Sequence, residues 1–312
     1  MAEKFKTMIG GQALIEGILM QGPDKRAIVV RSPDGLVDKV DSFVPLKEKN
    51  RILGWPIIRG CVSLFSSLYY GVKALSYSAE FYPEEDGEGK EPSKLDAWLE
   101  KKLSGEKAEK AVTVFGMCFG AVLAIILFFM LPTLVAGGLA KNVSSGILKN
   151  LIEGLVRIVI FLAYLYGVSR MKDIKRVFRY HGAEHKTIFC YEAGEELTVE
   201  NVRRQSRFHP RCGTSFLFVV MIISILVFSV VSWSSMAVRL ILRLLLLPVV
   251  VGISYEINRF VGRHDCTFTR IIIAPGLWLQ RITTAEPDDS MIEVGIQALK
   301  LVIPEVEGAD RW

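Results

Sequence analysis

The chain has 312 residues, of which 51% are hydrophobic, and carries a formal net charge of +5. This apolar content exceeds that of an ordinary soluble domain and indicates membrane segments. The modest positive charge, without a basic stripe interleaved with aromatic residues, excludes a typical nucleic-acid-binding protein. The five cysteines are odd in number and widely scattered, which argues against a disulfide framework.

The first fifty residues predict a small cytosolic unit that contains a β-hairpin. Residues 27–31 and 36–44 read as strands, and Ser32-Pro33-Asp34-Gly35 reads as the turn between them, because proline presets φ and glycine accepts a positive φ. No long apolar run lies within the first thirty residues, so we expect no cleavable signal peptide and a cytosolic location for the soluble parts.

Glycines punctuate the segment before this hairpin. The simplest interpretation of Gly10-Gly11 and Gly22-Pro23 is turn formation, with a ligand-binding loop as the alternative. Gln12 and Glu16 are the polar side chains in this segment that could serve a site.

Residues 51–110 predict an amphipathic helix followed by a linker. Apolar residues recur at helical spacing over residues 56–80, which suits either the membrane interface or the core of the protein. Residues 83–110 are charged and rich in helix breakers, with a short surface helix expected over residues 93–103.

Residues 111–258 predict a polytopic membrane domain with about four transmembrane helices. The first of them contains no charged residue and exceeds the length needed to cross a hydrocarbon core of about 30 Å. The expected spans cover residues 111–140, 146–169, 212–238 and 237–258. The fold class is therefore mainly α, with the β-containing unit at the N-terminus.

Several charged residues fall inside the expected spans. Glu153 and Arg157 are four residues apart and are expected to pair. Arg239 and Arg243 are expected to extend to the outer membrane surface. Glu256 and Arg259, at i and i+3, suit either a functional site or a pair that anchors the end of the fourth span.

The loops predict the orientation of the chain in a bacterial inner membrane. Residues 169–214 hold ten basic residues, whereas the short turn of residues 232–236 holds none. The positive-inside rule then places residues 169–214 and both termini in the cytosol. Residues 259–312 are expected to form cytosolic or interfacial helices, because Trp278 and neighbouring arginines favour the interface.

The stretch His181-Gly182-Ala183-Glu184-His185 has the spacing of an inverted zinc motif. On a helix, His181 and His185 share a face and Glu184 lies beside them. The two imidazoles would bind one divalent metal, most simply zinc, and Glu184 would act as a general base on a bound water.

A catalytic zinc takes a third protein ligand, which must come from elsewhere in the chain. His209 and Cys212 precede the third span and are the first candidates; the topology also brings His264, Asp265 and Cys266 to the same membrane surface, and Glu192 is a further oxygen ligand. Two alternatives stay open. In the first, a structural metal site is closed by four ligands, His181, His185, His209 and Cys212. In the second, no metal binds, and the motif residues pair with Arg179 or Lys186.

Four motifs together carry a resemblance. Their sequences are GGQALIEG with Gly22-Pro23, YHGAEHK, HPRCGTS and PGLWLQ. They resemble the YqhQ-like bacterial family, domain of unknown function 1385, whose members are described as predicted metal-dependent enzymes. The resemblance extends from about residue 8 to residue 300. It implies site roles for Gly11, Gln12, Glu16, His181, Glu184, His185, His209 and Cys212.

The sequence thus predicts a metal-dependent integral membrane enzyme, hydrolytic in type, with its site at the cytosolic membrane face. Its partners would be the lipid bilayer and a membrane-embedded substrate or protein. In the inverted zinc proteases a distant glutamate completes the site within a soluble fold; here the following motif, His209 to Cys212, adjoins a membrane span, which argues against a protease. The alternative is a non-catalytic scaffold or membrane-protein assembly factor with a structural metal or none.

Overall fold

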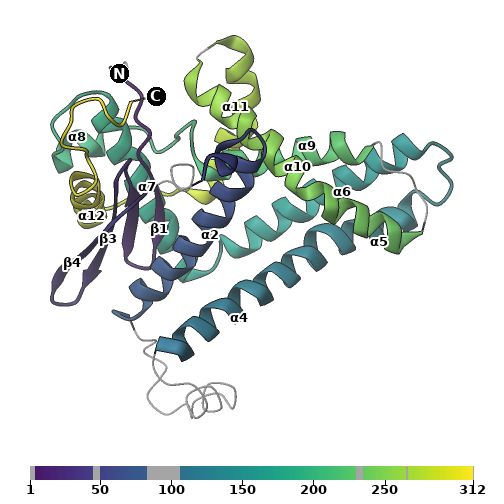
Figure 1. Cartoon of the computed structure of the whole chain (residues 1–312), viewed down its shortest axis with the longest axis horizontal. Coiled ribbons are helices and arrows are strands. Elements are labelled where there is room, and N and C mark those ends of the chain that lie inside the picture. The colour runs from purple at the N-terminus through teal and green to yellow at the C-terminus, as the bar shows by residue number, and fades with distance from the viewer. Residues whose placement is uncertain (1–3, 45–49, 83–105, 230–234, 265, 312) are drawn as a thin grey trace.

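The computed structural model describes residues 4–44, 50–82, 106–229, 235–264 and 266–311. They form a unit built around a small sheet and a bundle of long apolar helices (Figure 1). The helix expected over residues 93–103 lies outside the described residues. The fold is mainly helical with a β-containing unit at the N-terminus, as the sequence predicts, and that unit is a four-stranded sheet where the sequence indicated one hairpin.

The sheet is an antiparallel meander in which each strand pairs with the next. Its strands are β1 (Gly10–Leu14), β2 (Gly17–Gln21), β3 (Lys25–Ser32) and β4 (Gly35–Ser42). The predicted hairpin is β3–β4, and Gly35 has the positive φ of 134° expected at its turn. The expectation that Gly10-Gly11 forms a turn is wrong, because both residues lie in β1 and pair with β2.

Helices cover both faces of the sheet. One face, including Ile18, Met20 and Val29, packs in a common core with helices α7 (Lys172–Glu192) and α12 (Asp289–Lys300). The other face packs on α2 (Ile58–Ala79) through Ala74. The strand alternation therefore builds a three-layered unit from segments far apart in the chain (Figure 1).

The amphipathic segment of residues 56–80 forms α2, and the short 3₁₀ helix η1 (Arg51–Gly54) precedes it. Its two ends pack on different neighbours. Gly60 lies against Tyr255 and Gly252 of α10, and a Cβ at Gly60 would stand 2.7 Å from Tyr255 Cβ. Near the other end Gly71 lies against the Gln12 side chain. The helix thus ties the sheet to the bundle, while Phe65 on its outer face is exposed.

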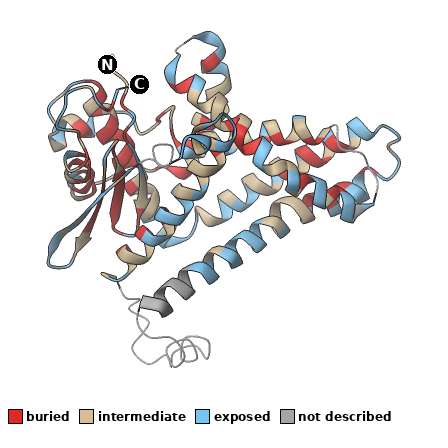
Figure 2. Cartoon of the chain, in the orientation of Figure 1, coloured by how far each residue is buried: buried red, intermediate tan, exposed pale blue. Residues whose placement is uncertain are grey.

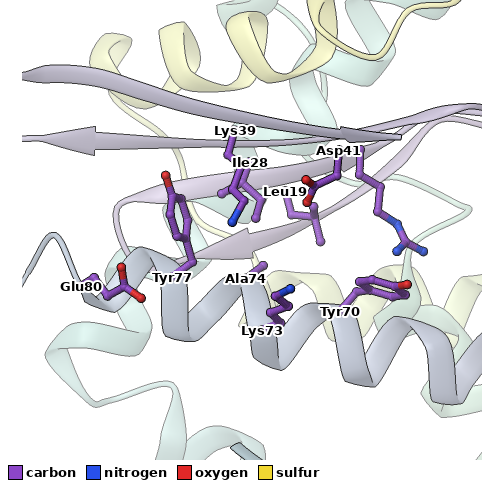
Figure 3. Close-up of a pocket in the computed structure, with 10 residues that line it drawn as sticks. Leu19, Ile28, Lys39, Asp41, Tyr70, Lys73, Ala74, Tyr77 and Glu80 are labelled. Atoms are coloured by element: carbon purple, nitrogen blue, oxygen red, sulfur yellow. The ribbon is translucent and has the colours of Figure 1, made fainter. Parts of the chain in front are cut away.

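A cavity of about 260 Å³ lies between α2 and the sheet (Figure 3). Leu19, Ile28 and Ala74 form its apolar floor, and charged side chains from β4 and α2 stand around it. The cavity is on the face of the sheet opposite α7, so it is separated from the histidine motif.

The bundle consists of α4 (Glu106–Ile125), a π-helical segment (Ile126–Met130), α5 (Leu131–Leu139), α6 (Gly146–Val168), α9 (Gly213–Ser229) and α10 (Met236–Arg263). Within the part of the chain that the structure describes, three helices are long and apolar enough to cross a membrane, namely Val114–Leu139, Gly146–Val168 and Ala237–Arg263. Of the about four expected spans, the third does not reach this length among the described residues, because α9 is described over 17 residues, to Ser229. Figure 2 shows that α4 is exposed along most of its described length.

A cluster of charged side chains is buried inside the bundle. The predicted pair forms, with Arg157 Nη2 3.2 Å from Glu153 Oε1. Arg243 also bonds Glu153, and it donates to Asn150 at 3.2 Å and Thr133 at 3.0 Å. The expectation that Arg243 reaches the outer surface is wrong: the residue is 1% exposed, because this carboxylate and these polar groups bind its Nη1 and Nη2 inside the bundle. Arg239 is buried beside the same cluster.

The anchoring pair of Glu256 with Arg259, one of the two interpretations of these residues, is not the ion pair that forms. Glu256 accepts from Arg59 of α2, with Arg59 Nε 2.6 Å from Oε1. Arg59 precedes Gly60, where α2 touches α10, so the ion pair reinforces that contact. Only the fold brings Arg59 to the end of α10.

Replacement of Arg243 by alanine should destabilise the bundle strongly. The change leaves the Glu153 carboxylate buried with less compensation, a situation that costs about 3–5 kcal/mol in proteins. Equilibrium unfolding in mixed micelles measures the free energy of unfolding. Lys141→Ala, which removes an exposed positive charge near the same end of the bundle, is the matched control and should change it by less than about 0.5 kcal/mol. Equal effects of the two changes would contradict the role of the cluster.

Candidate metal centre

The histidine motif lies in the second half of α7, the helix that faces β1 and α12. Helical spacing places His181 and His185 on one face, as predicted, with ring centroids 4.4 Å apart. Gly182 permits a close approach of the chain at residues 285–287: a Cβ there would stand 2.0 Å from the Ala285 carbonyl oxygen. A glycine is therefore required between the two histidines.

Cys212 joins the two histidines from the start of α9. One ligand atom from each of His181, His185 and Cys212 lies within 4.8 Å of the others. His181 Nε2 is 3.2 Å from Cys212 Sγ. The sequence offered several residues as the third ligand, and the structure brings Cys212 to the motif.

The other nitrogen of each imidazole is held by a backbone carbonyl. His181 Nδ1 donates to Thr283 O at 2.9 Å, and His185 Nδ1 donates to Arg207 O at 2.6 Å. A donating Nδ1 leaves the Nε2 lone pair available for a metal, which is the usual arrangement around zinc-bound histidines. His185 Nε2 is buried and accepts no hydrogen bond from the described residues, so the geometry leaves a ligand atom without a partner.

Glu184 lies beside the three potential ligands and packs against β1. It accepts a hydrogen bond from the Gly11 backbone N–H. A Cβ at Gly11 would stand 3.0 Å from Glu184 Cδ and 2.8 Å from the Leu19 carbonyl oxygen. The close approach of strand and carboxylate thus requires a glycine at position 11.

Burial and mutual proximity set the protonation of the cluster. Burial raises the pKa of Cys212, but His181 and His185 lower it well below the usual value of a thiol. Burial lowers the pKa of His181, but the neighbouring Cys212 more than offsets this effect, so the pKa is raised to about 9. Burial raises the pKa of Glu184, although the two histidines oppose the shift. The site therefore stabilises a thiolate, the form of cysteine that binds metals.

His209 lies next to this cluster but turns to another partner. Its ring centroid is 5.5 Å from that of His185, and its Nε2 is 3.5 Å from Glu192 Oε2. Burial and then the neighbouring Arg211 lower its pKa. Glu192 also accepts from Arg211 and from the Thr7 backbone at 2.8 Å. The closed site of two histidines, His209 and Cys212 is therefore not assembled, and Glu192 serves the surrounding packing.

Glu16 and Gln12 connect secondary-structure elements. Glu16 has a positive φ of 50° in the β1–β2 turn, and its buried carboxylate accepts from Arg176 and from Tyr180 at 3.0 Å. These contacts attach the turn to α7 at Arg176 and at Tyr180, the residue directly before His181. Gln12 points to the opposite face of the sheet, against Gly71 of α2.

The remaining candidates fall outside the cluster. His264 stacks on Phe260 and is exposed, Cys266 is exposed, and Asp265 lies outside the described residues. The proposed pairing of the motif with Arg179 or Lys186 is also not formed. Arg179 pairs with Asp288 and Lys186 with Glu286, so these cations face the segment that follows Thr284.

Gln280 is a residue whose role sequence reasoning missed. It lies fully buried in α11 (Thr267–Thr283). Its amide oxygen accepts from the His209 backbone N–H at 2.7 Å, and its amide nitrogen donates to the His209 carbonyl at 2.7 Å. These two hydrogen bonds to the His209 backbone hold the segment that carries Cys212. The PGLWLQ motif ends at Gln280, so the resemblance was the available signal.

The Gly11 contact predicts an unequal effect at two adjacent glycines. Gly11→Ala should destabilise the protein by about 1–3 kcal/mol, because the new methyl group meets a backbone carbonyl and Glu184. Gly10→Ala meets nothing within 4 Å and should stay within about 0.5 kcal/mol of the wild type. Thermal unfolding of both variants measures the difference. Similar stabilities for the two would contradict the close approach of β1 to Glu184.

Comparisons with known proteins agree with the resemblance noted in the motifs. The family model described as "Protein of unknown function (DUF1385)" matches residues 55–305. The uncharacterized protein YqhQ of Bacillus subtilis (strain 168) is 36% identical over 304 residues, which cover 95% of this chain and 92% of that protein. No solved structure matches. The chain belongs to the DUF1385 family of proteins of unknown function.

Proposed function

We propose that this protein is a metal-dependent membrane hydrolase with its site at the cytosolic face of a bacterial inner membrane. The metal is a divalent ion, zinc by the chemistry of the donors, and its ligands are His181, His185 and Cys212. Two imidazoles and one thiolate are a donor set that zinc accepts in catalytic sites with three protein ligands.

One observation carries the metal proposal. Both Nδ1 atoms are held by backbone carbonyls, and His181 Nε2 lies 3.2 Å from Cys212 Sγ. The buried His185 Nε2 also faces the cluster and has no hydrogen-bond partner among the described residues. A purely structural pair of histidines would be expected to use both ring nitrogens in hydrogen bonds, because a buried unsatisfied nitrogen is costly.

Glu184 is the group that would move a proton. Three protein ligands leave a fourth position in a tetrahedral site, and zinc there would supply Lewis acidity and lower the pKa of a water molecule. The Gly11 N–H orients the Glu184 carboxylate, and burial raises its pKa, which suits a general base near neutral pH. His181 and His185 would hold the metal, and Thr283 and Arg207 would orient their rings.

The membrane placement rests on the apolar helices and on the position of the termini. Three helices satisfy the length and hydropathy of a span, and α9, packed between α10 and α11, would be the fourth. The segment around Thr7 pairs with Arg311, so both terminal segments lie together at the sheet unit (Figure 1). The basic segment of residues 169–214 belongs to that same unit, which supports a cytosolic location for both termini.

A structural metal site in a membrane scaffold or assembly factor is the second candidate. Burial of the cluster favours it: His185 is 1% exposed, and the cavity next to α2 lies on the other face of the sheet. In that case the metal would join α7 to the start of α9, and Glu184 would serve packing alone.

Metal content is the first test. Purified wild-type protein should hold about one zinc per chain by elemental analysis, because three protein ligands of zinc type converge. The double variant His181→Ala, His185→Ala should hold almost none. His264→Ala removes an exposed histidine away from the cluster and should keep the wild-type content. Equal and near-zero metal in all three proteins would exclude the metal proposal.

Glu184→Gln separates the two candidate functions. The isosteric change should leave the zinc content intact and lower hydrolysis of amphiphilic chromogenic esters or phosphodiesters by about 10²–10⁴-fold, the usual contribution of a general base. Glu305→Gln, an exposed substitution, is the control. Zinc retention without any Glu184-dependent turnover would favour the structural site and the scaffold.

A further inference from the structure

Helix α11 distributes its polar and apolar side chains differently from a surface helix of a soluble protein. Its buried face is largely polar or small, with Thr269, Gln280 and Thr283 turned toward the protein and Gly276 packed against Ser215 of α9. Large apolar side chains lie on its outer face: Phe268 is 63%, Ile271 66% and Trp278 51% exposed. A surface helix in water shows the opposite pattern. The reversed pattern calls for an apolar neighbour on the outside.

The position of α11 in the fold says which neighbour this is. The helix follows α10 directly and extends sideways from the end of the bundle that adjoins the sheet unit (Figure 1). An apolar helix face at the end of a span meets the boundary between acyl chains and lipid headgroups. Trp278 has the ring type enriched at that depth.

Charge around α11 favours anionic headgroups. Arg270 and Arg281 are exposed on the helix, and Arg259 and Arg263 precede it at the end of α10. The sequence from residue 257 to residue 285 contains a single acidic residue, Asp265, against these four arginines. Each basic residue near an anionic membrane surface adds attraction.

We propose that α11 is an interfacial helix that inserts its Phe268, Ile271 and Trp278 face into the cytosolic leaflet and binds anionic phospholipid headgroups through Arg270 and Arg281. The proposal rests on the membrane placement proposed above and not on the metal. The helix lies parallel to the bilayer surface, with the apolar face at the acyl-chain boundary and the arginines among phosphates.

This placement sets the depth of the candidate metal centre. Thr283, at the end of α11, holds His181 by its carbonyl, and Gln280 holds the backbone of His209. The metal ligands therefore lie directly beneath the headgroup layer. A substrate of this site is an amphiphile whose polar group lies at headgroup depth.

Fluorescence quenching of a single tryptophan tests the insertion. The full chain with Trp55, Trp98, Trp233 and Trp312 replaced by phenylalanine keeps Trp278 as its fluorophore. In phosphatidylcholine vesicles, lipids brominated on the acyl chain should quench Trp278. Aqueous iodide should quench it at most about one third as strongly as it quenches a water-exposed tryptophan, because interfacial rings are shielded from solvent. Strong iodide quenching without quenching by bromolipid would overturn the insertion.

A matched control places the probe far from α11. Val306 is 72% exposed near the C-terminus, and Val306→Trp in a protein where phenylalanine replaces all native tryptophans should be quenched by iodide and not by bromolipid. Reconstitution of both proteins in sealed vesicles also tests the spans. If the proteins fail to insert in bilayers at all, the membrane placement itself falls. If they insert and iodide quenches Trp278 as strongly as the probe introduced by Val306→Trp, only the proposal for α11 is contradicted.

Thermal unfolding in nanodiscs tests the headgroup preference. Replacing part of the phosphatidylcholine by phosphatidylglycerol should raise the unfolding midpoint of the wild type, and Arg270→Gln, Arg281→Gln should lose most of that rise. Lys300→Gln, an exposed charge on α12, should keep it. Inorganic phosphate added to phosphatidylcholine nanodiscs should not reproduce the rise. An equal rise in the arginine variant, or full replacement by phosphate, would contradict binding of lipid headgroups by α11.

Discussion

Two hydrogen bonds from imidazole Nδ1 atoms to backbone carbonyls govern the candidate site. The carbonyl of Thr283 lies at the end of α11, and that of Arg207 lies in the loop before α9, whereas both histidines lie on α7. Three separate parts of the chain must be in place before the two Nε2 atoms face Cys212. The site is therefore a product of the assembled protein, and its donor geometry depends on the same contacts that join the sheet unit to the bundle.

Close backbone approaches make this assembly possible. Gly11 lets β1 approach Glu184, Gly182 lets α7 approach Ala285, and Gly276 lets α11 approach Ser215. At each position a Cβ would meet neighbouring atoms at 3.0 Å or less, several of them backbone. These glycines explain why the motifs around the site contain residues without chemistry of their own. They allow the backbone segments to approach closely, and this approach brings the neighbouring polar side chains within reach of one another.

Polar groups also specify the apolar part of the molecule. Arg157 donates to the Phe128 carbonyl in the π-helical segment at 3.0 Å and to Ser224 at 3.1 Å. Glu153 accepts a hydrogen bond from Thr133 and pairs with Arg157 and Arg243. In a low-dielectric bundle such partners fix which helix faces meet, because any other register leaves charges unpaired. At the sheet end, Arg59 and Glu256 do the same between α2 and α10.

The sequence alone determined the elements whose signal is local: the apolar helices, the β3–β4 hairpin, the helical register of His181 and His185, and the Glu153–Arg157 pair. These follow from residue periodicity and from spacings of three or four. Only the tertiary structure decided that Cys212 and not His209 joins the histidines, and that Gly11 lies in a strand next to Glu184. It also decided that Arg243 pairs with Glu153, and that Glu256 pairs with Arg59. These contacts join residues tens to hundreds of positions apart. Their partners are chosen by burial and packing, which no local pattern in the chain records.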